Sequence, residues 1–250
     1  SFCSGRLGGI LINVLIYLPL AYWLWHAPFG SKFRKGPATP RRSIRGLSDV
    51  IETARAVADN RIIVSMTLLS GAGAFMIGTA HSAQIPEFAS RLGHGDGLFY
   101  SILFGANAAG AFVGGIILES YSILPPRPKA AGILVGLWAI VIGAFAMSDI
   151  YLLSVAFLFV GGFLNLAYNS MAQTLVQIHA PAEIRGRVIG LYSTARSGLM
   201  TFSGITVGFA GGLIGVDWSL GLSALVLLLI VVSLIPLIRQ ASAPKLAAGL

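Results

Sequence analysis

The sequence predicts an all-α protein that crosses a membrane several times, and three observations predict this class. The chain of 250 residues is 56% hydrophobic and only 10% charged, with a mean hydropathy of +0.82. A soluble domain carries roughly 25% charged residues. The apolar residues fall into seven runs, each near the ~20 residues that a helix needs to cross a bilayer. The basic residues are concentrated between these runs, as in membrane proteins.

The runs are expected to be helices, because a helix satisfies its own backbone hydrogen bonds inside lipid. We expect a first spanning helix within residues 1–27, a basic cytoplasmic linker at 28–60 and a cytoplasmic tail at 239–250. Apolar residues at helical spacing predict an amphipathic helix at 47–58, which either lies on the membrane or on the bundle or is a solvated linker helix with no binding role. The seven apolar runs are, in order, 8–25, 62–80, 98–118, 130–147, 150–177, 188–214 and 218–238.

Basic residues orient the chain. On one side of the predicted membrane lie Lys32, Arg34, Lys35, Arg41, Arg42, Arg45, Arg55, Arg127, Lys129, Arg185, Arg187, Arg239 and Lys245. The opposite side has only Arg6 and Arg91. The positive-inside rule then places the amino terminus outside and the carboxy terminus in the cytoplasm of a plasma (inner) membrane. Nucleic acid is excluded as a partner, because these cations are not spread over a folded surface; the expected partner of the surface is the lipid bilayer.

The six runs within 61–238 predict a half bundle of two inverted three-helix repeats. In each triple, the third run has no Asn, Gln or charge in its interior. We therefore expect 130–147 and 218–238 to face lipid and the other four helices to face one another or a cavity.

A polar path is predicted along two of these helices. Asn165, Asn169 and Gln173 recur every fourth residue and share one helix face. On the next helix Arg196 and Ser193 belong to one such face. Polar groups are too costly in hydrocarbon to face lipid, so these faces should line a cavity for a small-molecule substrate.

The run 98–118 adds two further candidates and a packing motif. Tyr100 and Asn107 share a face, and Asn107 either bonds a neighbouring helix or contacts substrate. Gly110 and Gly114 fit close helix packing, and glycine would also let the helix bend. Cys3 is the single cysteine and has no metal-ligand spacing, so neither a metal nor a cofactor is expected.

The polar corner at 181–187 joins the two polar helices. It contains Glu183, Arg185, Gly186 and Arg187. The two arginines either anchor the helix at the cytoplasmic membrane edge or form an ion pair that depends on conformation.

Residues 181–192, together with Asn165, Asn169 and Gln173, resemble the tenth and eleventh helices of the major facilitator superfamily. The likeness is to the branch of the enterobactin exporter and drug exporters, and it covers nearly the whole chain as the sixth to twelfth helices. It implies a secondary active transporter that alternates access, an antiporter-type exporter of drug-like or siderophore-like molecules, completed by an amino-terminal half that this chain lacks. The acidic-and-basic motif between the family's eighth and ninth helices is degenerate here.

Other functions fit the residues less well. A retinal protein needs a lysine inside a span, and an intramembrane enzyme needs acidic residues or histidines there; the runs contain neither, so no enzyme is expected. An oligomeric channel or a non-transporting seven-helix protein is the alternative, without the charged rings or filter typical of channels.

Arg196 is the one charge well inside a predicted span. It lies nine residues beyond Arg187, which places it ~14 Å deeper at ~1.5 Å per residue. We expect it to meet an acidic residue of the other half or an anionic group of the substrate; snorkelling to the interface is the alternative.

Overall fold

The computed structural model describes residues 2–27, 47–78, 80–91, 97–121 and 126–242. These residues form nine helices and no strand, which confirms the all-α class. The chain divides into two units, Ser1–Ile44 and Arg45–Leu250. The first contains α1 (Phe2–His26). Residues 28–46 of the predicted linker 28–60 and residues 243–250 of the predicted tail 239–250 lie outside the described residues.

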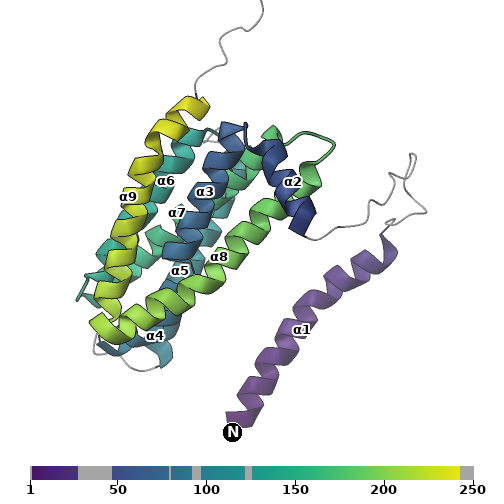
Figure 1. Cartoon of the computed structure of the whole chain (residues 1–250). Coiled ribbons are helices and arrows are strands. Elements are labelled where there is room, and N and C mark those ends of the chain that lie inside the picture. Colours follow the sequence, from purple (N-terminus) through teal and green to yellow (C-terminus); the bar gives the residue numbers. More distant parts are fainter. Residues whose placement is uncertain (1, 28–46, 79, 92–96, 122–125, 243–250) are drawn as a thin grey trace, which may run out of the picture. The chain divides into compact units, whose positions relative to one another are not determined.

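The second unit contains the other eight described helices (Figure 1). Five of them, α5 to α9, are long and apolar enough to cross a membrane. The sequence predicts seven spans; the described apolar part of α1, Val14–His26, and the 16-residue α3 are shorter. The bounds are α2 (Leu47–Val57), α3 (Arg61–Met76), α4 (Ala80–Arg91), α5 (Gly97–Tyr121), α6 (Pro128–Ala146), α7 (Tyr151–His179), α8 (Arg185–Ile214) and α9 (Val216–Ser242).

The predicted run 62–80 ends earlier than expected, and a helix that the sequence did not predict follows it. Gly78 adopts φ +37°, a left-handed conformation that only glycine accepts readily. A Cβ at Gly78 would also collide with the Ala74 carbonyl and the Ser203 hydroxyl. The chain therefore turns after α3 and continues as α4. Hydropathy does not predict α4, because the helix is polar and contains Pro86.

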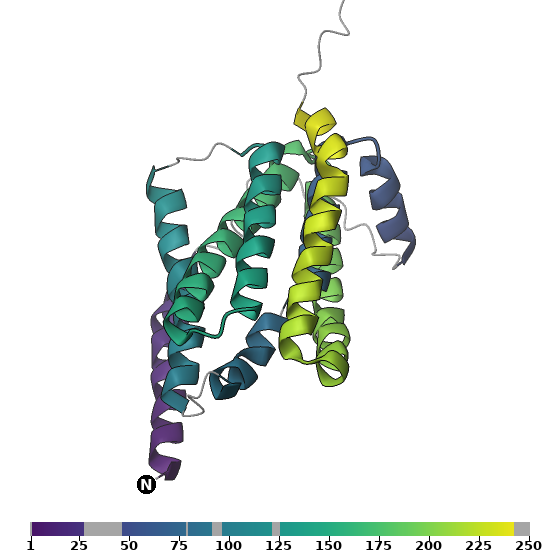
Figure 2. The same ribbon diagram turned by 90° about the vertical axis from the view of Figure 1, so that its left-hand side faces the viewer.

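The packing of the second unit follows an inverted repeat of α3–α5–α6 and α7–α8–α9. Helix α5 packs along α7, and α3 packs along α8, both as parallel pairs. Exchanging α3 with α7 and α5 with α8 maps each of these pairs onto the other. The antiparallel pair of α6 and α9, side by side in Figures 1 and 2, maps onto itself. This symmetry supports the inverted three-helix repeats that the sequence predicts.

The core lies where α6 and α7 meet α3. Trp138 and Tyr168 are fully buried with their rings 5.3 Å apart, and Phe145 is buried nearby on α6. More of α6 is buried than of any other candidate span. Its opposite face, with Ile133 and Ile140, is exposed. Only this outer face is available for the lipid contact predicted for 130–147, and that contact stays a prediction.

Helices α5 and α7 approach one another closely through glycines. A Cβ on Gly110 would collide with the carbonyl of Phe159, and one on Gly162 would collide with the carbonyl of Asn107. At Gly114 a Cβ would come within 3.1 Å of the Phe163 ring. The two predicted packing glycines thus lie at this contact, and Gly162 supplies the reciprocal position on α7.

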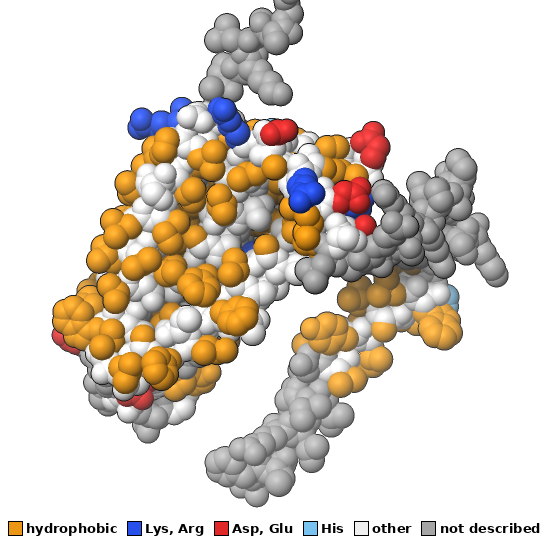
Figure 3. Space-filling view, in the orientation of Figure 1, with side chains coloured by type: hydrophobic (Ala, Val, Ile, Leu, Met, Phe, Trp, Pro, Cys, Tyr) orange, Lys and Arg blue, Asp and Glu red, His pale blue; other side chains and the backbone are white. Residues whose placement is uncertain are grey.

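Cations gather at one end of the second unit, where Asp49, Glu52, Asp59 and Glu183 also lie, whereas acidic residues mark the other end. Figure 3 shows Lys and Arg side chains at the end where α9 finishes. The element order puts Arg55, Arg61, Arg127, Lys129, Arg185, Arg187 and Arg239 at this end, and Glu87, Asp149 and Asp217 at the other.

Candidate functional site

The polar faces predicted on two helices meet in the structure. Nε of Arg196 on α8 donates a hydrogen bond to Oδ1 of Asn169 on α7 over 3.0 Å. Nδ2 of Asn169 donates to the carbonyl of Asn165 at 2.9 Å and to its Oδ1 at 3.2 Å. All three side chains are half-buried. The network satisfies both polar ends of Asn169 and fixes the orientation of the guanidinium.

A cavity of about 130 Å³ lies beside this network, between α7 and α8. Gln173, Ser193 and Ser197 line it, and all three are exposed. The side chains of Asn169, Tyr192 and Arg196 complete the lining. The lining therefore offers amide, hydroxyl and guanidinium groups, which can donate several hydrogen bonds to one bound anion or polar group.

Two residues that the sequence did not single out form a buried pair, and one of them, Tyr192, lines the cavity. The hydroxyls of Tyr192 and Ser70 share a buried hydrogen bond of 2.8 Å, which links α8 to α3. Tyr192 lies four residues before Arg196, so the periodicity that marked Arg196 could have indicated it. Ser70 carried no such signal, because small hydroxyl residues occur throughout apolar helices.

Arg196 lies next to no carboxylate within the described part of the chain. An ion pair among the described residues joins Arg187 to Glu52, away from Arg196. A planar guanidinium offers five N–H donors, of which Nε is used by Asn169. Arg196 also lines the cavity, and no hydrogen bond of its two amino groups is found among the described residues.

The candidates on α5 lie apart from this cavity. Tyr100 is 37% exposed and packs its ring 6.2 Å from that of Phe104. Asn107 is half-buried, and its carbonyl faces Gly162 at the contact with α7. Neither residue lines the polar cavity, so the structure does not gather all the predicted path residues at one place.

The polar corner at 181–187 contacts the amphipathic helix α2 through Arg187 rather than pairing with its own Glu183. Nη2 of Arg187 lies 3.7 Å from Oε2 of Glu52 on α2 and donates to the Asp49 carbonyl at 3.5 Å. Glu183, Arg185 and Gly186 are exposed, and Gly186 has open space at its Cβ position. Arg187 therefore forms an ion pair in the structure, and the dependence of this pair on conformation stays a prediction.

Helix α2 rests on α8 through a narrow face. Thr53 and Val57 are buried, and the Thr53 hydroxyl donates to the Asp49 carbonyl at 2.7 Å. Val50 and Ile51, which belong to the predicted apolar stripe, are exposed. Part of that stripe thus remains free for the membrane surface.

No group of three or more potential metal ligands is assembled within the described ranges.

Comparisons with known proteins identify the family. The sequence profile of the Major Facilitator Superfamily matches residues 7–204. Neither the curated proteins nor the solved structures give a match. The profile covers most of the chain and the structure supplies the helices, so the chain belongs to the Major Facilitator Superfamily, a family of membrane transporters.

Proposed function

We propose that this protein is a secondary active transporter that exports a small drug-like or siderophore-like molecule through the cavity between α7 and α8. The observation that carries the proposal is the guanidinium of Arg196, held by Asn169 inside two helices of membrane length. An uncompensated cation there costs ~2.5–3.5 kcal/mol on insertion scales. In this proposal, binding of the transported molecule by Arg196 compensates that cost and explains why the cation is present.

The proposal includes a second bundle that faces α5 and α8. These are the two candidate spans with the smallest buried share. One exposed strip of α8 is small and polar, with Ser193, Ser197, Thr201, Gly204 and Gly208, and large apolar side chains such as Phe202, Ile205 and Phe209 are exposed beside it. The polar strip suits either close helix contact or a water-filled path better than it suits lipid. An amino-terminal half of the same transporter is the partner that we propose.

The proposed orientation puts the cation-rich end of the second unit in the cytoplasm. In a Cys3→Ser background, a single cysteine introduced at exposed Glu183 should not react with an impermeant maleimide added to intact cells. One introduced at Asp149, at the other end, should react. The reverse pattern would overturn the orientation.

Export itself is supported by the resemblance of residues 181–192 and of the Asn165–Asn169–Gln173 spacing to exporters. The test uses inverted membrane vesicles from cells that express the complete reading frame. Two probes, ethidium and a radiolabelled catecholate siderophore, represent the two expected substrate classes. Uptake of either probe that requires an imposed ion gradient and stops when the gradient is dissipated supports an antiporter.

The same assay separates the alternatives. Arg196→Gln vesicles serve as the control for the cavity, and vesicles without the protein give the background. Flux that only follows the probe's own gradient and does not saturate indicates a channel and contradicts the proposal. Absence of gradient-driven uptake of both probes contradicts the assigned substrate classes.

A further inference from the structure

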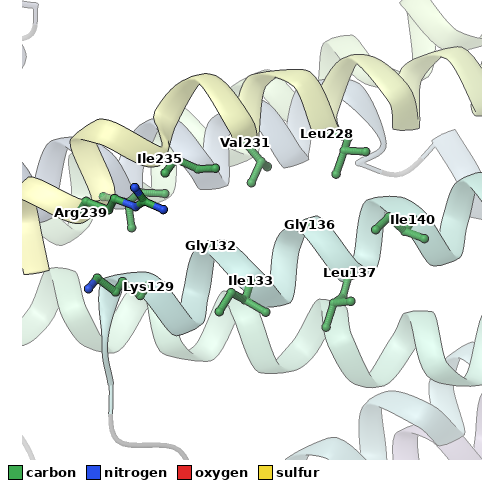
Figure 4. A pocket seen from close by; sticks show the side chains of 11 residues that line it. Lys129, Gly132, Ile133, Gly136, Leu137, Ile140, Leu228, Val231, Ile235 and Arg239 are labelled. Carbon is green, nitrogen blue, oxygen red and sulfur yellow. The ribbon is translucent and has the colours of Figure 1, made fainter.

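A second cavity lies on the other side of the bundle, between α6 and α9, and has a different character. It encloses about 410 Å³ and is lined almost entirely by apolar groups. Figure 4 shows Ile133 and Leu137 of α6 on one side and Leu228, Val231 and Ile235 of α9 on the other. This apolar groove belongs to the helix pair that carries no polar path residue.

Glycines keep the groove open along α6. A Cβ at Gly136 would meet Val231 at 3.8 Å, an ordinary contact, and one at Gly132 would meet the Ile238 side chain at 3.1 Å. Side chains larger than alanine at these positions would fill the space between the helices. The groove therefore depends on the absence of side chains at two successive turns.

Two cations stand at one end of the groove. Lys129, at the start of α6, and Arg239, near the end of α9, both line it and lie together in Figure 4. Both side chains are exposed. Lys129 also belongs to the first turn of α6, where the helix dipole favours an anion.

The length of the groove matches one leaflet of a bilayer. Ile140 lies 11 positions after Lys129 on the helix, a distance of roughly 16 Å at 1.5 Å per residue. Half of a hydrocarbon core is about 15 Å thick. An occupant with an anionic group at the cations and an acyl chain along the helices would fit both features.

We propose that the groove between α6 and α9 binds an anionic phospholipid, with its phosphate at Lys129 and Arg239 and an acyl chain beside Gly132 and Gly136. The charge complementarity selects this occupant over a peptide or a second copy of the chain, because an apolar helix face would leave both cations unpaired. The inference requires membrane insertion but not transport, so it survives or fails separately from the proposed function.

Native mass spectrometry of the purified full-length protein tests the site. The delipidated protein is titrated with dioleoylphosphatidylglycerol or with dioleoylphosphatidylcholine, which has the same chains and no net charge. We expect the first phosphatidylglycerol to bind at least fivefold more tightly, since each cation near a membrane surface contributes about fivefold. Lys129→Gln combined with Arg239→Gln should abolish this preference. Arg127→Gln removes a neighbouring exposed cation that does not line the groove and should retain it.

A second variant tests the acyl-chain half of the site. Gly136→Leu should weaken the first binding event for both lipids severalfold, while circular dichroism shows an unchanged helix content. Equal binding of the two lipids by the unmodified protein would overturn the proposal. An equal effect of Arg127→Gln and the double variant would do the same. A lipid-free dimer that Gly136→Leu dissociates would identify a second copy as the occupant and also overturn it.

Discussion

The guanidinium Nε of Arg196 and the Oδ1 of Asn169 are 3.0 Å apart and join α8 to α7. The bond connects the first and second helices of the second repeat at the edge of the polar cavity. It turns one nitrogen of Arg196 toward protein and leaves the planar end of the group available. We propose that a charged side chain anchored in this way binds a ligand rather than reaching to the membrane surface.

Substitution of Arg196 should impair transport without preventing insertion. Arg196→Lys keeps the charge but loses the planar fork, whereas Arg196→Gln loses the charge as well. A hydrogen bond to a charged group contributes about 1.5–3 kcal/mol, so Arg196→Gln should reduce initial flux by roughly tenfold or more, with a smaller loss for Lys. Vesicle flux normalised to protein in the membrane measures the effect. Full activity of Arg196→Gln would remove Arg196 from the path.

The glycine contact between α5 and α7 predicts opposite outcomes for two substitutions on one helix. Gly110→Ala drives a Cβ into the Phe159 carbonyl and should destabilise the protein by about 1–3 kcal/mol. Gly105→Ala is the matched control, because open space surrounds its Cβ position and alanine favours the helix by up to ~1 kcal/mol. Unfolding in detergent, followed by tryptophan fluorescence, compares them. Equal stability of the two variants would contradict the tight α5–α7 crossing.

Asn60 holds two helices together at the cation-rich end of the second unit. Its Oδ1 accepts from the amides of Ile62 and Ile63, and its Nδ2 donates to the His179 carbonyl at 3.2 Å. Asn60→Ala removes both functions and should lower the free energy of unfolding by about 1–3 kcal/mol. Asn60→Ser keeps a capping oxygen and should lose roughly 0.5–1.5 kcal/mol, the contribution of one hydrogen bond. A Ser variant as unstable as the Ala variant would argue against the cap.

The contact of Arg187 with Glu52 predicts rescue by charge exchange. The two side chains are 33% and 54% exposed, so we expect each single reversal, Arg187→Glu or Glu52→Arg, to cost only ~0–1 kcal/mol of stability. Local docking of α2 is the more sensitive measurement. Limited proteolysis within 47–57 should be faster in each single variant and return toward the original rate in the double variant. Additive acceleration in the double variant would show that the pair does not hold α2.

Periodicity and hydropathy suffice to predict the helical class, the five long spans and the polar faces of α7 and α8. These features can be predicted because each one depends on residues that are close together in the sequence, within a few helical turns. The break at Gly78 and the polar helix α4 were missed, because a left-handed turn and an amphipathic segment leave little trace in a hydropathy run. The long-range pairs could not be predicted either. Ser70 meets Tyr192 across 122 positions, and Gly162 meets the carbonyl of Asn107, through contacts that only the helix packing creates.

The central claim is that the face shared by α7 and α8 lines a polar path, and solvent access to that face tests it most directly. Single cysteines are introduced in a Cys3→Ser background at Gln173 and Ser197, which line the cavity, and at Leu225 and Leu229, which are exposed on apolar α9. An impermeant methanethiosulfonate reagent is applied to the complete protein in membranes, and its reaction rate at each position is measured. The account predicts rapid modification at 173 and 197 and none at 225 and 229. Protection of 173 and 197 from the reagent, with reaction on α9 instead, would contradict it.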